Sequence, residues 1–307
     1  MGFSEADVIS VLKKVFTTAD PRILLGIGDD AAVVRGGAQQ VITTDMAVAD
    51  VHFKTEWSSA FDIGRKITAA NIADVLSMGA TSDYLVAAVS LTGSEELSWI
   101  ENLARGMKDE ADRAGAVIVG GDIARSSVVT IAMTAIGYTD NPILRSGARV
   151  GDGIFVSSLP GWSAAGLELL TREISINSAV ADKALSEFSA PSLDYEVDFQ
   201  QATSMADISD SLLIQTQQVA EASGVCFDFD TDLISRCEEF KELNELAQEI
   251  DSDIWSWILA GGEDHVFLAT GKDLPGIQIG AVVKGSGISG VEIKKLPLMN
   301  IRAADFW

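Results

Sequence analysis

The stretch that the rest of the chain serves reads Gly26-Ile-Gly-Asp-Asp-Ala-Ala-Val-Val34, followed by Gly36-Gly37 and then by Gln40-Val-Ile-Thr-Thr-Asp45. Two β-branched arms, Val33-Val34 and Val41-Ile42, flank the glycine-containing connection. This pattern predicts a β-hairpin. If Val34 faces Val41, continuing the register places Asp30 opposite Asp45.

Oxygen-bearing side chains would then gather at the open end of this hairpin: Asp29, Asp30, Asp45, Thr43 and Thr44. Like charges this close repel by about 1 kcal/mol per pair even in water, so we expect a cation among them. Hard oxygen ligands favour Mg²⁺ over a metal that prefers thiolates. The alternative is a solvated turn rich in Asp, and this stretch alone does not separate the two.

The length of 307 residues predicts two domains, because a single core rarely extends that far. We expect an N-terminal α/β domain over residues 1–140 and a C-terminal α/β domain over residues 150–307. Asn141 to Asp152 would connect them, with Arg145 and Arg149 as its notable charges. Either arginine is suited to a phosphate oxygen, or it balances charge in an acidic protein.

The net charge of −23 repels nucleic acid and anionic membranes, so neither is an expected partner. An anionic substrate would also be repelled unless clustered carboxylates hold divalent cations that invert the local field. The sequence has no run of 18 apolar residues and no signal-peptide pattern at its N-terminus, which predicts a cytoplasmic protein. Cys226 and Cys237 lack metal-ligand spacing.

Two acidic positions stand out in the first half of the chain. A helix is predicted from about Ser59 to Met78, and Asp74 lies on its packing face, where a carboxylate needs a partner. The alternative for Asp74 is an exposed residue near the helix end. A short strand, Ala116 to Val119, runs into Gly120-Gly121-Asp122. Bare backbone N–H groups beside a carboxylate suit a phosphate with its metal, although this is also common turn chemistry.

The second half of the chain also has acidic residues where a strand gives way to a helix and in a glycine-rich loop before a strand. A strand at Gly153 to Val156 is followed by the acidic segment Asp207-Ile-Ser-Asp210 at the start of a helix that ends at Gly224. Asp210 is either the N-cap of this helix or a ligand, whereas Asp207 has no capping role. Gly261-Gly-Glu-Asp264 then leads into a predicted strand from His265 to Ala269, and it fits a loop that closes on a ligand.

Taken in order, these motifs resemble the thiamine-monophosphate kinase family over residues 26–264. They are Gly26 to Ala32, Thr43-Thr-Asp45 with His52-Phe53, Asn71-Ile-Ala-Asp74-Val-Leu-Ser-Met-Gly79, Gly120-Gly-Asp122, Arg145-Ser-Gly-Ala-Arg-Val-Gly-Asp152, Asp207-Ile-Ser-Asp210 and Gly261-Gly-Glu-Asp264. The resemblance implies the fold of aminoimidazole ribonucleotide synthetase: two α/β domains with mixed sheets, an active site in the cleft between them, and a homodimer formed through the N-terminal sheets. It also implies ATP as co-substrate, several Mg²⁺ ions, thiamine monophosphate as acceptor and thiamine diphosphate as product.

The resemblance also assigns roles by position. The magnesium shell would comprise Asp29, Asp30, Thr43, Thr44, Asp45, Asp74, Asp122, Asp207 and Asp210. Asp45, Asp207 and Asp210 would act directly on the transferring phosphoryl group. ATP would contact Gly121, Asp122, Arg145 and Ser209. Thiamine monophosphate would contact His52, Glu263 and Trp307, with Phe306 as the alternative aromatic residue.

Several positions depart from the family pattern. Ser211 replaces a glycine, Ala114 replaces an aromatic residue, and the usual Tyr-Glu after Gly-Gly-Glu-Asp is His265-Val266. The tail reads Ala303-Ala-Asp-Phe-Trp307 in place of the family ending.

Two other functions fit parts of the pattern. One is a different ATP-dependent enzyme of the same superfamily, such as aminoimidazole ribonucleotide synthetase, a hydrogenase-maturation dehydratase or selenophosphate synthetase. The last usually has a reactive residue near its N-terminus, whereas the first cysteine here is Cys226. The other is a non-catalytic divalent-metal-binding protein, which would need the carboxylates but not Arg145 or Gly121.

Overall fold

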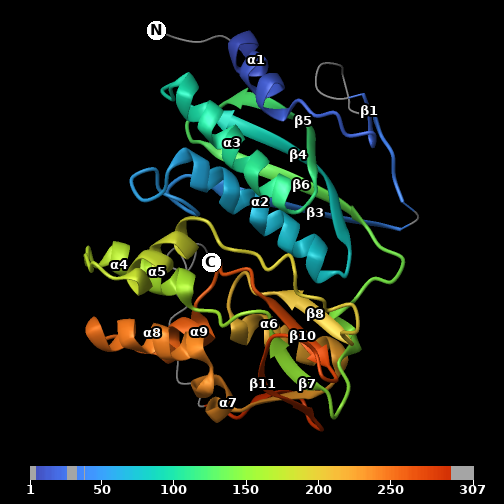
Figure 1. The fold of residues 1–307 in the computed structure, drawn as a ribbon, viewed down its shortest axis with the longest axis vertical. Coiled ribbons are helices and arrows are strands. Elements are labelled where there is room, and N and C mark those ends of the chain that lie inside the picture. The colour runs from blue at the N-terminus through green and yellow to red at the C-terminus, as the bar shows by residue number, and fades with distance from the viewer. Residues whose placement is uncertain (1–4, 26–32, 38, 292–307) are drawn as a thin grey trace. The chain divides into compact units, whose positions relative to one another are not determined.

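The computed structural model describes residues 5–25, 33–37 and 39–291. The chain divides into two compact units (Figure 1). Unit 1 comprises Met1–Leu76 and Ala80–Asn141, and unit 2 comprises Ser77–Gly79 and Pro142–Trp307. Among the described helices, none combines the length and the apolar composition needed to span a bilayer.

Unit 1 is built on a four-stranded sheet in the order β3-β6-β4-β5. Its strands are β3 (Gln40–Val48), β4 (Thr81–Leu91), β5 (Val117–Arg125) and β6 (Thr130–Tyr138). β6 is antiparallel to β3 and β4, whereas β4 and β5 are parallel and are joined by the crossover helix α3 (Leu97–Arg113). Burial alternates along β6, so one face of the sheet is covered and the other is more open.

Two further helices complete unit 1: α1 (Glu5–Phe16) and α2 (Ala60–Ser77). α2 and α3 lie on the same face of the sheet (Figure 1), and α1 packs against α3 and β5. Glycines bring the backbones of α2 and α3 into contact. A Cβ on Gly64 would lie 2.2 Å from the carbonyl oxygen of Leu103, and one on Gly106 would lie 1.9 Å from that of Phe61.

The predicted hairpin is wrong. β2 (Val33–Val34) pairs with β1 (Ile23–Leu25), not with β3. β3 pairs along its whole length with β6, so Asp45 lies opposite Met133 rather than Asp30. A nine-residue ladder with a distant strand satisfies far more backbone groups than a two-residue arm.

The strand predicted to stop at Gly120-Gly121-Asp122 continues through these residues as β5. Gly121 lies opposite Ala87 of β4, and a Cβ on Gly121 would be 1.9 Å from the Ala87 carbonyl oxygen. The glycine therefore permits close approach of two strands rather than ending one. Because β5 is the last strand in the sheet order, its outer edge has no further strand beside it in this sheet.

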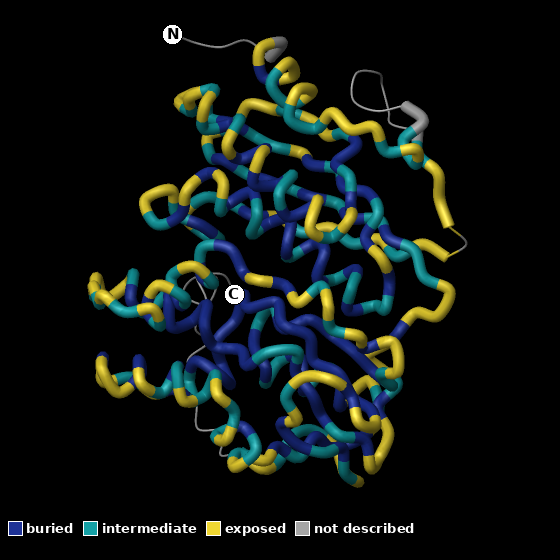
Figure 2. The backbone as a smooth tube through the Cα atoms, in the orientation of Figure 1, coloured by how far each residue is buried: buried dark blue, intermediate teal, exposed yellow. Residues whose placement is uncertain are grey.

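Unit 2 contains a six-stranded sheet in the order β12-β9-β11-β7-β10-β8. The strands are β7 (Gly153–Val156), β8 (Ser204–Asp207), β9 (Cys226–Phe229), β10 (Phe267–Gly271), β11 (Ile277–Val283) and β12 (Gly287–Ser289). All neighbours are antiparallel except β12 and β9. Figure 2 shows β7, β8 and β10 almost entirely in the colour of buried residues.

The helices of unit 2 are α4 (Trp162–Thr171), α5 (Ala179–Ser189), α6 (Leu212–Ser223), α7 (Thr231–Arg236), α8 (Glu238–Glu249) and α9 (Ile254–Ala260), with a 3₁₀ turn η1 at Arg145–Gly147. α6 packs against η1, α9 and four strands of the sheet: β8, β9, β10 and β12. One apolar cluster joins these helices to the strands, with Phe227, Leu212 and Trp257 fully buried in it. Packing in this core fixes the positions of β8 and β10 relative to each other.

Candidate active site

In unit 1, strand β3 presents alternate side chains to α2. Thr43 Oγ1 donates a hydrogen bond of 2.6 Å to Asp74 Oδ2. The backbone N–H of Asp45 donates to Asn71 Oδ1 at 3.1 Å, and the buried Asn71 amide donates to the Ile67 carbonyl oxygen at 2.9 Å. The partner that a carboxylate on this helix face requires is therefore Thr43 of β3. These contacts bring Thr43 and Asp74 together, with Asp45 next along the strand.

Thr44 faces the other side of the sheet, because side chains alternate along a strand. Its hydroxyl donates to the Met133 carbonyl oxygen at 2.9 Å and accepts from Thr134 Oγ1 at 3.2 Å. The structure does not bring the Thr44 side chain together with Thr43 and Asp74. Only the backbone of Thr44 lies beside them.

His52 follows the end of β3. Its ring Nδ1 accepts a hydrogen bond of 3.1 Å from the backbone N–H of Val48. The backbone N–H of His52 donates to the Val48 carbonyl oxygen at 2.9 Å. Because Nδ1 accepts, the neutral ring carries its proton on Nε2. His52 can therefore present a donor to an anionic ligand.

Gly121 and Asp122 are exposed residues of the edge strand β5. They line an apolar cavity of about 150 Å³ that lies among α1, α3, β4 and β5. Phe16 at the end of α1 also lines it, together with Leu12, Met107 and Ile118. Ala114, where the family pattern has an aromatic residue, is the C-cap of α3.

Three predicted site residues, Asp29, Asp30 and Trp307, lie outside the described residues, as does Phe306.

In unit 2, the two acidic segments predicted from the sequence lie side by side. Beyond the ladder of β8 and β10, the Ile208 N–H donates to the Val266 carbonyl oxygen at 2.8 Å, and the His265 N–H donates to that of Ile208 at 3.0 Å. The Glu263 N–H then donates to the Ser209 carbonyl oxygen at 2.7 Å. These bonds join the segment that carries Asp207 and Ser209 to the segment that carries Glu263.

Asp207 is the last residue of β8, and it is almost fully buried. Its Oδ2 lies 3.0 Å from Nδ1 of His265, which is also buried. Glu263 and His265 both have left-handed backbone conformations, with φ of +68° and +53°. Such strain persists only where the surrounding structure holds it, and it is common at functional sites.

Asp210 is not the N-cap of α6. Ser211 has that role, because its hydroxyl accepts from the Ile214 N–H at 3.2 Å. Oδ2 of Asp210 lies 3.5 Å from Nε2 of Gln215, which lies 3.4 Å from the Ser209 hydroxyl. Gln215 is buried, and its Oε1 accepts from the Ser211 N–H at 3.0 Å. The sequence analysis did not single out Gln215, although a polar residue on the buried side of a helix is a signal for a fixed contact.

Asp264 has a structural role rather than a ligand role. Its two carboxylate oxygens accept from the backbone N–H groups of Gly161 and Ser163, at 3.0 and 2.9 Å, where α4 begins. Gly161, with φ of +116°, has no side chain to serve as the cap. Burial raises the pKa of Asp264 to about 7, although both N–H groups favour the charged form.

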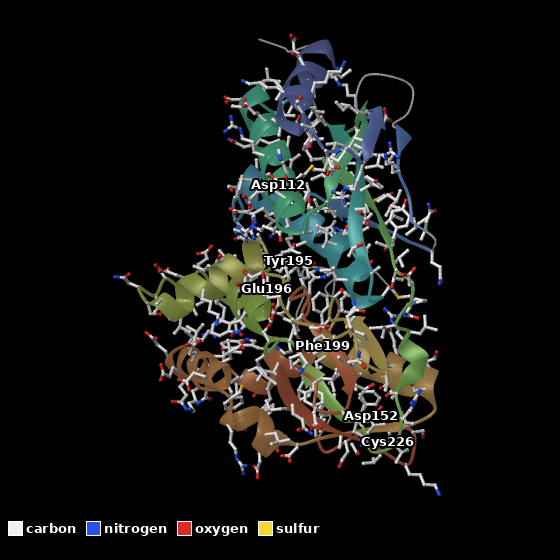
Figure 3. The ribbon with its side chains drawn as sticks, turned by 45° about the vertical axis from the view of Figure 1, so that its right-hand side comes forward. Asp112, Asp152, Tyr195, Glu196, Phe199 and Cys226 are labelled. Carbon is white, nitrogen blue, oxygen red and sulfur yellow. The ribbon has the colours of Figure 1, made fainter. Side chains whose placement is uncertain are left out.

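Arg145 is exposed on η1, and its Nη1 donates to Gln218 Oε1 of α6 at 3.0 Å. The hydroxyl of Ser223 donates a hydrogen bond of 2.8 Å to the Arg145 carbonyl oxygen. Asp152, labelled in Figure 3, closes the following turn by accepting from the Arg149 N–H at 2.9 Å. Arg145 therefore extends from an anchored backbone, while Asp152 is structural.

The donor chemistry of these residues fits Mg²⁺, because carboxylate and hydroxyl oxygens are the groups that Mg²⁺ prefers. Among the described residues, no three acidic, histidine or cysteine side chains are gathered closely enough to hold a metal ion. Asp29 and Asp30, the adjacent acids predicted for the magnesium shell, are outside that set.

A family model described as AIR synthase related protein, N-terminal domain, matches residues 28–139. Among curated proteins, a thiamine-monophosphate kinase from Mycobacterium tuberculosis is 37% identical over 250 residues, which cover 80% of this chain and 74% of the relative.

Solved structures agree with this relation. The crystal structure of thiamine-monophosphate kinase from Stenotrophomonas maltophilia K279a has a TM-score of 0.80 at 28% identity, covering 94% of this chain and 97% of that one. The structure described as AaThiL complexed with AMPPCP and TMP has a TM-score of 0.77 at 27% identity, covering 94% of both chains. The α/β fold is therefore that of the aminoimidazole ribonucleotide synthetase superfamily, and the chain belongs to the thiamine-monophosphate kinase family.

Proposed function

We propose that this protein transfers the γ-phosphoryl group of ATP to thiamine monophosphate and forms thiamine diphosphate. The observation that carries the proposal is the joining of two motifs in unit 2. Hydrogen bonds hold the segment of Asp207, Ser209 and Asp210 against the segment of Glu263. Residues expected to meet the phosphates thus lie beside a residue expected to meet thiamine.

The reaction needs no general base. The acceptor is a phosphate monoester with a second pKa of about 6, so it is largely ionised at neutral pH. Catalysis then consists of aligning two anions in line and reducing their repulsion. His52, whose Nδ1 is already an acceptor for Val48, serves as a binding group that donates through Nε2.

The net charge of −23 repels anionic substrates, and bound divalent cations would reduce this repulsion. Mg²⁺, when bound, neutralises charge on the phosphate oxygens and orients them for in-line transfer. The residues that would hold it are Asp29, Asp30, Thr43, Thr44, Asp45, Asp74, Asp122, Asp207 and Asp210. For Thr44 we assign the backbone, because its side chain faces away from Thr43 and Asp74.

ATP would contact Gly121, Asp122, Arg145 and Ser209. The apolar cavity beside Gly121 suits a nucleobase, because such sites are concave and mostly apolar. Phe16, which lines the cavity, offers an aromatic ring where Ala114 has none.

Thiamine monophosphate would contact His52, Glu263 and Trp307. Glu263 is 8% exposed, and a buried carboxylate favours the cationic ring of thiamine over an anionic group. This feature favours thiamine monophosphate over the substrates of other enzymes in the superfamily.

We also propose that two copies of this chain associate through the open face of the unit 1 sheet. Ile42 and Met46 of β3 are 61% and 53% exposed on that face, which is unusual for large apolar side chains. Light scattering should give twice the chain mass of 32.5 kDa. Combining Ile42→Lys with Met46→Lys should halve it, whereas Val150→Lys, at an exposed position of unit 2, should not.

The proposed reaction is tested by incubating the protein with ATP, MgCl₂ and thiamine monophosphate. We expect thiamine diphosphate and ADP in equal amounts by chromatography. Asp210→Asn, purified in the same way, controls for a contaminating kinase. Formation of aminoimidazole ribonucleotide from its own precursor, without any thiamine diphosphate, would contradict the proposal.

A further inference from the structure

The histidine that follows the Gly-Gly-Glu-Asp motif is held against an acidic residue of the candidate active site. His265 Nδ1 lies 3.0 Å from Oδ2 of Asp207. The side chains of the two residues are only 10% and 3% exposed. In the family that this chain resembles, the position is usually Tyr, so a histidine here is a departure from the family pattern.

The backbone fixes both ends of this contact. Asp207 is paired with Phe267 across β8 and β10, and the His265 N–H donates to the Ile208 carbonyl oxygen at 3.0 Å. His265 has a left-handed backbone conformation, with φ of +53°, which few residue types tolerate. Strain at a buried polar contact is retained where the contact has a use.

The hydrogen bond restricts the carboxylate. An ionised carboxylate only accepts, so Nδ1 carries the proton, opposite to the tautomer of His52. With Oδ2 engaged, rotation of the Asp207 side chain is limited. A carboxylate that ligates a metal depends on such partners for its orientation, and their loss typically weakens metal binding by about 10- to 100-fold.

We propose that His265 is a positioning residue that orients Asp207 for Mg²⁺. This inference rests on the proposed function, in which Asp207 is a magnesium ligand. His265 does not touch the phosphates or the metal in this role. It acts only through the Asp207 carboxylate.

The test uses variants that separate the hydrogen bond from the backbone conformation. His265→Ala removes the donor, whereas His265→Asn keeps a donor near the position of Nδ1 and tolerates a left-handed conformation. His265→Gly removes the donor without backbone strain, and it replaces the alanine variant if that protein does not fold. Glu173→Ala is the matched control, because Glu173 is exposed and has φ of +52°.

The probe is Mn²⁺, titrated into each protein with AMPPCP and followed by electron paramagnetic resonance. We expect His265→Ala or His265→Gly to weaken Mn²⁺ binding by at least about tenfold, with His265→Asn and Glu173→Ala within about threefold of wild type. The Mg²⁺ concentration for half-maximal thiamine diphosphate formation should shift by the same factor, with an unchanged KM for thiamine monophosphate.

Equal Mn²⁺ affinity in wild type and His265→Ala would overturn the proposal and leave His265 a packing residue. Equal losses in His265→Asn and His265→Ala would also overturn it, since the donor would then not matter. A wild-type protein that binds no Mn²⁺ with AMPPCP would overturn the magnesium part of the proposed function as well. The outcomes therefore distinguish failure of this inference alone from failure of the larger proposal.

Discussion

At the scale of single residues, the sequence allowed Asp210 to be either the N-cap of α6 or a ligand, and the structure removes the first of these two roles. Ser211 caps α6, so Asp210 is free of that role. Substituting Asp210→Asn removes one negative charge but leaves the cap. We expect kcat to fall by about two orders of magnitude or more, which is about 2.7 kcal/mol of transition-state stabilisation. The melting temperature of the metal-free protein should stay the same or rise, because one repelling charge is gone.

The matched control for this experiment is Ser211→Ala. It removes the cap and should cost about 1 kcal/mol of stability, while its loss of kcat stays well below that of Asp210→Asn. Steady-state kinetics and thermal melts measure both variants. If Asp210→Asn kept more than about a tenth of wild-type kcat at saturating Mg²⁺, Asp210 would not be a ligand of the transferring group.

Asp264 should make the stability of the protein depend on pH. Burial raises the pKa of Asp264 to about 7 in the folded protein, well above the usual range of an aspartate carboxyl group. Between about pH 4 and 7 the folded state therefore holds a proton that the unfolded chain has released. The contribution of this group to the free energy of unfolding is present at low pH and is lost as the pH rises through 7.

Asp264→Asn removes that titration. Urea unfolding of the metal-free protein at pH 5, 6, 7 and 8 should show a less negative slope of stability against pH than in wild type. Parallel pH profiles for the two proteins would contradict the assignment.

At the scale of elements, the contact between α2 and α3 should reverse the usual effect of a helical Gly-to-Ala change. Such a change normally stabilises a helix by about 1 kcal/mol. A Cβ on Gly106 would lie 1.9 Å from the Phe61 carbonyl oxygen, a backbone atom that cannot turn aside. We expect Gly106→Ala to destabilise unit 1 by about 1–3 kcal/mol in urea unfolding. Asn102→Ala, at an exposed position of the same helix, is the control and should be neutral or stabilising.

Sequence reasoning identified elements whose evidence is local. The strand Gly153–Val156 matches its predicted bounds, because it is a short apolar run with clear breaks on both sides. Thr92 and Glu95 have the spacing of a capping box, but the Glu95 carboxylate accepts from the Thr92 N–H in a closed turn, and α3 starts only at Leu97. Helices α7 and α9 span fewer than eight residues, too few for a helical period to be read from their sequences.

The remaining errors involve partners that are distant in sequence. β3 and β6 pair across about ninety residues, and nothing near Val41 indicates that partner. The same holds within the candidate site. Asp207 and Asp210 were found from their spacing, whereas the contact of His265 with Asp207 joins two residues that are distant in sequence. The chemistry of a motif is thus visible in sequence, and its supporting hydrogen bonds are not.

At the scale of the whole molecule, a site shared by Mg²⁺ and nucleotide should link stability to these ligands. Mg²⁺ and nucleotide that share a site should together raise the melting temperature by more than the sum of their separate effects. A ligand that binds only the folded state contributes about 2.7 kcal/mol at a hundredfold excess over Kd. Thermal melts with MgCl₂, with AMPPCP and with both measure this. Strictly additive shifts would argue against a shared site.

Every residue from Gly261 to Thr270 is buried, including the segment that carries Glu263 and His265. Substitutions there therefore disturb packing and backbone hydrogen bonds at the same time as any ligand contact. The loop around His52, from Asp50 to Ser59, is exposed or half-buried except at Phe53 and Ser58, and it has more freedom to vary. During divergence of substrate preference, Glu263 and His52, two of the three residues proposed to contact thiamine monophosphate, would accept mutations at very different rates, and new specificities would arise first on the His52 side.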